Sequence, residues 1–228
     1  MLRLLSRKVT VASLGSRCYI KTMMPSPKPV ARDSLAGFSI LELFLVIVII
    51  FIAYTLFMSA GSKSNQEKRL ADCQANLQSI YAALNTYAPD HDGAFPAVPG
   101  ASSSEAPLSL LVPKYTTGTE FFICPGGSDK PLPPARPFAD GKISYAYYMG
   151  WTQAGGAGAP LMSDAQVNTA PKTPGQPVFS PDGKKPGNNH NKFGGNFLFG
   201  DGNVQSTPAR LTLTLPPMTN ILLLNPKP

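Results

Sequence analysis

A single carboxylate lies inside a long apolar stretch near the start of the chain. Glu42 is the only charged residue from Phe38 to Ala60. An ionised group inside the hydrocarbon of a membrane costs a few kcal/mol unless it is paired, so such residues usually serve a function. The partner that suits a buried carboxylate is a cation, such as an amine. Glu42 is therefore the first functional candidate in this sequence.

Cysteine chemistry is the second possibility. Cys73 and Cys124 follow the apolar stretch, whereas Cys18 precedes it. In an oxidising compartment such a pair commonly forms a disulfide. Closing a loop of about 50 residues stabilises a fold by about 4 kcal/mol in the chain-entropy estimate. We predict this disulfide; the alternative is two buried thiols that pack as small apolar residues.

Metal ligands are sparse. The histidines, His91 and His190, and the two separated cysteines do not have the spacing of a zinc site. Asp90 and Asp92 could supply oxygens to calcium, although the acidic pattern of an EF-hand is absent. The same aspartates could instead make side-chain bonds within a turn. We therefore expect no cofactor, with Asp90 and Asp92 as weak calcium candidates.

Motifs of the common enzyme classes are missing. The sequence has no Gly-x-Ser-x-Gly nucleophile and no Gly-x-x-x-x-Gly-Lys loop for phosphates. Trp151 and the nearby tyrosines 145, 147 and 148 are expected to be core and sheet residues rather than a platform for a ligand. We predict that the protein is not an enzyme and has no catalytic residues.

The positive charge of the chain is confined to its first 37 residues. Of 20 bases and 13 acids in all, seven bases and one acid lie there, which gives +6 for residues 1–37 and +1 for residues 38–228. No basic stripe remains to neutralise phosphates, so we expect no nucleic-acid partner. Bases just before an apolar span indicate the cytoplasmic side of a membrane.

The first 60 residues are expected to form a leader and a membrane anchor. Residues 1–37 mix bases with prolines, have no sustained period, and are typical of a targeting segment. Residues 38–60 form a helix of roughly 35 Å, long enough to cross a hydrocarbon core of about 30 Å. We predict a cytoplasmic, cleaved leader, a single transmembrane helix and an extracytoplasmic C-terminal part.

The helix is predicted to continue beyond the membrane to residue 88. No proline occurs between Phe38 and Ala88, whereas 21 of the 24 prolines follow. Apolar residues recur at helical spacing on one face, which predicts an amphipathic segment over 61–88; they are Leu70, Cys73, Leu77, Ile80, Leu84 and Tyr87. Gly61-Ser62 and the possible capping box from Ser64 indicate a kink or a fresh start. We expect this stripe to pack on a sheet of the same chain rather than in a coiled coil.

Residues 89–228 are predicted to form a small β-rich domain. Pro89 ends the helix, Leu108–Leu111 form a helical turn, and residues 143–149 alternate as a strand. Residues 152–178, rich in Gly, Ala and Pro, are expected to form a long surface loop. The fold class is α+β, with a long N-terminal helix packed on a small antiparallel sheet.

The strongest local indication of a β-hairpin lies in the C-terminal region. Asp201-Gly202 joins two β segments, Phe197–Phe199 and Val204 onward, as a hairpin turn. Leu211, Leu213 and Leu215 alternate with threonines as a further half-buried strand, and Ile221–Leu224 is another strand candidate.

The N-terminal pattern, Gly37-Phe38-Ser39-Ile40-Leu41-Glu42, resembles the processing site of type IV pilins and type II secretion pseudopilins. The resemblance implies cleavage after Gly37 by a prepilin peptidase and methylation of the new N-terminus, Phe38. It also implies that Glu42 pairs with the amine of a neighbouring subunit during assembly. The usual family form has Thr-Leu-Ile in place of Ser39, Ile40 and Leu41, and the spacing from glycine to glutamate is kept.

Two later segments are similar to the same group. Tyr87 followed by Asp92-Gly93 and Phe95-Pro96 resembles the turn that ends the pseudopilin helix, and acidic loops of secretion pseudopilins bind calcium. His190 followed by Asp201-Gly202 is similar to a C-terminal signature of pilin-like proteins, with ten intervening residues in place of nine.

The function that these features predict is a structural subunit. The resemblance implies a prepilin assembled into a pseudopilus or type IV pilus, more in keeping with type II secretion. Its partners would be prepilin peptidase, copies of itself and related pilins, and an inner-membrane assembly platform. The alternative is a single-pass membrane protein whose outer domain binds a ligand or hydrolyses an envelope polymer. That alternative predicts an uncut Gly37 and a cleft with converging polar groups.

Overall fold

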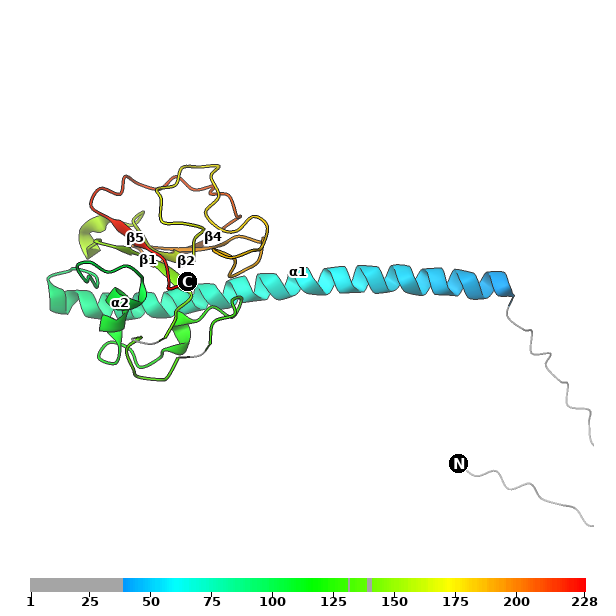
Figure 1. Cartoon of the computed structure of the whole chain (residues 1–228), viewed down its shortest axis with the longest axis horizontal. Helices are drawn as coiled ribbons and strands as arrows, with labels where there is room; N and C mark the ends of the chain where they lie inside the picture. Colours follow the sequence, from blue (N-terminus) through cyan, green and yellow to red (C-terminus); the bar gives the residue numbers. More distant parts are fainter. Residues whose placement is uncertain (1–38, 131, 139–140) are drawn as a thin grey trace, which may run out of the picture. The chain divides into compact units, whose positions relative to one another are not determined.

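The computed structural model describes residues 39–130, 132–138 and 141–228 (Figure 1), without the side chains of residues 57–63. The chain divides into two units, Met1–Ile47 and Val48–Pro228, and each is described by itself. The predicted leader and the processing residues Gly37 and Phe38 lie outside the described residues.

The long helix α1 comprises Ile40–Tyr87. It has no break at Gly61-Ser62, so the fresh helix start considered there is not present. A 3-10 turn, η1, follows at Ala88–His91 with Pro89 near its start, as the proline predicted.

Within the residues that the structure describes, no helix has a stretch both long and apolar enough to cross a membrane. The predicted span, 38–60, includes Phe38 and the side chains of residues 57–60, which are not described. The membrane span stays a prediction.

The five strands form one antiparallel sheet, so the α+β class is confirmed. The strands are β1 Tyr145–Met149, β2 Pro160–Asp164, β3 Gly195–Phe199, β4 Val204–Thr207 and β5 Leu222–Leu224. They lie in the order β4-β3-β2-β1-β5. Short helical turns accompany them: α2 Glu105–Leu108, η2 Ser109–Leu111, η3 Glu120–Phe122 and η4 Gln153–Gly155.

The stripe on the second half of α1 supplies one wall of the main core. Its residues Cys73, Leu77, Ile80, Leu84 and Tyr87 are buried, and Leu70 is half-buried. They share one cluster with sheet residues that include Tyr145, Tyr147, Met162 and Leu198. In Figure 1 the strands accordingly lie along the C-terminal part of α1. This confirms that the stripe packs on a sheet of the same chain.

The other face of the sheet has a smaller core. Tyr148 and Phe197 alternate with residues that face α1 and pack with Phe179, Val178 and Leu211. All three tyrosines of β1 are buried, as predicted, and Trp151 is half-buried against both clusters.

The Asp-Gly hairpin is confirmed. Strands β3 and β4 pair antiparallel from Gly195↔Thr207 to Leu198↔Val204. Tyr81 of α1 donates a hydrogen bond from its hydroxyl to the carbonyl of Gly200 at 2.8 Å, which ties the turn to the helix.

The surface loop predicted over residues 152–178 is wrong, because it contains the central strand β2. All five residues of β2 are buried, so the strand shows no apolar–polar alternation. The strand begins at Pro160, and the first position of a strand tolerates a residue without an N–H. Gly and Ala residues precede it. Pairing with β1 and β3, not local propensity, makes this segment a strand.

The strand predicted over Leu211–Leu215 is also wrong. Leu211 is buried and Leu213 and Leu215 are half-buried against the smaller core, so the alternation marks a real apolar face. The backbone of Leu211, however, bonds to Gly175 and Gln176 in a loop, and no ladder forms. The last predicted strand, Ile221–Leu224, is present as the shorter β5.

The turn of the hairpin provides a test of the docking on α1. Gly202 has φ +81°, and a Cβ there would lie 2.5 Å from the Tyr81 ring. Gly100 also has positive φ, +76°, but a Cβ there meets nothing within 4 Å. Gly100→Ala should therefore lower the free energy of unfolding only by the conformational cost of positive φ, about 1–2 kcal/mol. Gly202→Ala should lose about 1–3 kcal/mol more.

Urea unfolding of the full-length protein, followed by the fluorescence of Trp151, measures both losses. Equal losses for the two variants would contradict the docking of the turn on Tyr81.

Candidate functional site

Glu42 lies in the first turn of α1, and apolar side chains surround it in sequence. Its neighbours Ile40, Leu41 and Phe44 are 89%, 77% and 67% exposed. The exposed large apolar residues continue to Leu56. An uncovered apolar surface of this length marks an interaction with a membrane or another protein. Glu42 is the one carboxylate on this surface and could form an ion pair with a cation of the partner.

The two predicted disulfide partners are joined. Cys73, on the buried face of α1, and Cys124, just after η3, form a disulfide with a Cα–Cα distance of 5.5 Å. Both residues are fully buried. The bond links α1 to the segment before β1 and closes a separation of 51 residues.

Two further polar side chains converge on this disulfide. The Nε2 atom of His190 lies 3.4 Å from the sulfur of Cys124 and 3.3 Å from the Oδ2 atom of Asp164. Asp164 ends β2 and His190 precedes β3, and both side chains are buried. One ligand atom from each of Cys73, Cys124, Asp164 and His190 lies within 4.8 Å of the other three. We call these four residues the disulfide cluster.

Sequence reasoning missed this cluster. The four residues come from segments up to 117 residues apart, so no local spacing in the sequence indicates that they meet. Asp164 lies in the segment predicted to be a surface loop, and the histidines and cysteines lack the spacing of a zinc site in the sequence. The one usable signal was the position of His190 close to the strongest hairpin.

Backbone and amide donors hold the carboxylate of Asp164. The backbone N–H of Asn196 donates to Oδ2 of Asp164 at 2.8 Å, and the side-chain amide of Asn189 donates to Oδ1 at 3.0 Å. Asn189 also donates to the carbonyl of Ser144 at 2.7 Å, which fixes its orientation. Burial, together with the charge of Asp164, raises the pKa of Tyr145 well above its usual value, so this tyrosine stays neutral.

The cluster does not have the geometry of a catalytic triad. A triad needs the carboxylate on one ring nitrogen and the nucleophile on the other. Here the same atom, His190 Nε2, faces both Asp164 and Cys124. The buried Nδ1 atom has no hydrogen-bond partner among the described residues. The four side chains surround a common point and do not form a chain for proton transfer.

One of the two calcium candidates, Asp90, already has side-chain partners. The carboxylate of Asp90 accepts a hydrogen bond from Lys114 at 2.8 Å and another from the Tyr115 hydroxyl at 2.9 Å. These two bonds hold the pKa of Asp90 below its usual value. Asp92 ends η1 in a left-handed conformation, φ 54°. Among the described residues, the disulfide cluster is the only group of three or more His, Cys, Asp or Glu side chains close enough to share an ion. Calcium at Asp90 and Asp92 stays a prediction.

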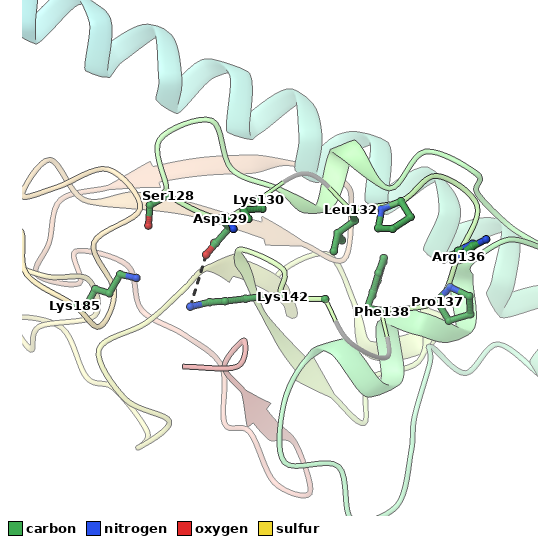
Figure 2. A pocket seen from close by; sticks show the side chains of 11 residues that line it. Ser128, Asp129, Lys130, Leu132, Arg136, Pro137, Phe138, Lys142 and Lys185 are labelled. Atoms are coloured by element: carbon green, nitrogen blue, oxygen red, sulfur yellow. Dashed lines mark ion pairs between the residues drawn. The ribbon is translucent and has the colours of Figure 1, made fainter.

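A basic hollow of about 810 Å³ lies beside the segment after η3 (Figure 2). Asp129 and Lys142 point toward each other across it and form an ion pair at 3.7 Å, and Lys130, Arg136 and Lys185 also line it. It contains no pair of carboxylates for acid–base chemistry among its described lining residues.

Comparisons with known proteins give no relative from which to transfer a role: no family model, curated protein or solved structure matches the chain.

Labelling of thiols in denaturant tests the disulfide. Cys18→Ser leaves Cys73 and Cys124 as the two cysteines, so this variant should react with no thiol reagent before reduction and with two equivalents afterwards. Reduction should lower the free energy of unfolding by about 4 kcal/mol, because the unfolded chain regains its loop entropy. Two reactive thiols in the unreduced, denatured variant would show that the bond is absent from the isolated protein.

Proposed function

We propose that this chain is a prepilin-like structural subunit. It is processed after Gly37, anchored by residues 38–60, and assembled through its N-terminal helix into a pseudopilus or a type IV pilus. The observation that carries the proposal is the exposed apolar surface of α1 with Glu42 as its one carboxylate.

The mechanism follows from the cost of burying that carboxylate. When apolar helices bundle, Glu42 leaves water and needs a compensating charge. Cleavage after Gly37 would create a free amine on Phe38, four residues before Glu42, and the amine of one subunit would pair with Glu42 of the next. Assembly would then add apolar contact area and one buried ion pair at each step.

The described fold is compatible with this role. The second half of α1 packs on a small antiparallel sheet, as expected for a pilin-like domain at the end of a long helix. A buried disulfide suits an extracytoplasmic domain. The turn after Tyr87 and the Asp201-Gly202 hairpin favour a secretion pseudopilin over a pilus subunit.

Glu42→Leu tests the assembly contact. The variant should insert in the membrane and be processed normally, because it only makes the helix more apolar. Fibres should be lost, since the partner amine would be buried without its counter-charge at a cost of about 3–5 kcal/mol. Asp72→Ala is the matched control, because it removes an exposed carboxylate from the same helix outside the apolar stretch. Electron microscopy and membrane fractionation give the readouts; normal fibres with Glu42→Leu would refute the ion pair.

Gly37→Leu tests the processing step separately. A bulky side chain before the cut should leave the leader attached, so N-terminal sequencing should find the original start and not Phe38. Ser39→Ala is the control on the other side of the cut and should be processed. A mature N-terminus at Phe38 in Gly37→Leu would exclude this cleavage site.

A further inference from the structure

We propose that the disulfide cluster is a zinc site when its cysteines are reduced, and that the disulfide is the metal-free state of the same four residues. The two states exclude each other because zinc binds thiolates, and a sulfur in an S–S bond is not a thiolate.

The spacing of the ligand atoms fits a tetrahedral ion. With Zn–S distances of about 2.3 Å and Zn–N or Zn–O distances of about 2.0–2.1 Å, a tetrahedron has S–N edges of about 3.5 Å and N–O edges of about 3.3 Å. The observed distances are 3.4 Å from Cys124 to His190 and 3.3 Å from His190 to Asp164. These two edges therefore need almost no movement, and reduction frees the two sulfurs to separate.

The donor set selects zinc over hard cations. Thiolate, imidazole and carboxylate groups all bind zinc, whereas calcium and magnesium prefer oxygen ligands. Four protein ligands would fill the coordination sphere. The site would thus hold α1 against the sheet and would have no open position for a substrate.

Neighbouring donors already orient the ligands. Asp164 is held by Asn189 and by the backbone amide of Asn196, and the N–H of Gly126 donates to the sulfur of Cys124 at 3.3 Å. Contacts of this kind fix the direction of ligand atoms before an ion arrives. The carboxylate of Asp164 is buried without a lysine or arginine partner among the described residues, and a bound cation would compensate its charge.

A pocket of about 490 Å³ lies beside the cluster. Gly126 and Asn189 line it, and both lie next to the histidine ring. A Cβ on Gly126 would lie 2.7 Å from His190 Nδ1. The glycine therefore lets the backbone that lines the pocket lie closer to the histidine ring than a residue with a side chain could.

Exchange between the two states balances in electrons and protons. Two small-molecule thiols can reduce the disulfide: they supply two electrons and two protons, leave as one small-molecule disulfide, and give two protein thiols, whose protons are released when zinc binds. In the reverse direction, a small-molecule disulfide accepts two electrons from the two protein thiolates, takes up two protons from water and leaves as two thiols. The protein S–S bond forms and Zn²⁺ is released.

Cobalt(II) is the probe for the test, in the full-length Cys18→Ser protein so that Cys73 and Cys124 are its two thiols. After reduction with a phosphine and removal of the reductant without oxygen, the protein should bind one Co²⁺ per chain. The expected spectrum has thiolate-to-cobalt charge transfer and strong tetrahedral d–d bands, and Zn²⁺ should displace the cobalt. Unreduced protein should bind none, and oxidised glutathione should release one metal ion per chain from the loaded protein.

Three variants make the outcome specific. Cys124→Ser and His190→Gln should each weaken binding at least about tenfold, as loss of a metal's supporting contacts already does. His91→Gln, at the other histidine, should bind like the parent. Circular dichroism reports whether each reduced protein is folded, and refolding of a reduced, unfolded protein on addition of Zn²⁺ would support the site.

Failure to bind one equivalent in folded, reduced protein would overturn the proposal. So would failure of Zn²⁺ to refold an unfolded one, or unchanged binding in Cys124→Ser. None of these outcomes bears on fibre assembly, which depends on Glu42.

Discussion

The packing of one helical stripe against the sheet is the interaction on which the rest of this domain depends. Leu77, Ile80 and Leu84 are completely or almost completely buried, and they contact strands that come from the far end of the sequence. The sheet is small, and its edge strands β4 and β5 have only four and three residues. Two cores, one on each face, hold it together, and α1 closes the larger one. Without the helix, the face with Tyr145 and Tyr147 would lie open to water.

The same helix carries two different kinds of apolar surface. Around Leu77 the apolar residues occupy one face, and polar residues such as Asp72 lie on the other. Around Phe44 they occupy every face and remain exposed. A helix that is apolar all round needs an apolar environment on all sides, from lipid or from other helices. Lipid would meet this requirement for a membrane anchor, and other helices would meet it in the assembled fibre that we propose.

The parts of the fold that depend on short-range patterns were predictable. The 3-4 spacing of the stripe, the Asp201-Gly202 turn and the alternation of β1 each follow from local rules, and the structure contains all three. Strand β2 was not predictable, because a strand buried on both faces has no alternation and this one follows Gly and Ala residues. Leu211–Leu215 failed in the opposite way: its alternation is real, but no neighbouring strand pairs with it.

The two candidate sites also differ in whether the local sequence reveals them. Glu42 is visible in the sequence because its context is local, whereas the disulfide cluster exists only after β2 and the segment before β3 are placed beside α1. Desolvating a carboxylate and an imidazole in a core costs free energy that an apolar pair of similar volume would not. Asp164 recovers part of that cost through Asn189 and Asn196, but His190 Nδ1 recovers none from a described partner. In the oxidised fold His190 contacts Asp164 through Nε2 alone, whereas the zinc site that we propose would give this histidine a second role, as a ligand beside Cys73 and Cys124.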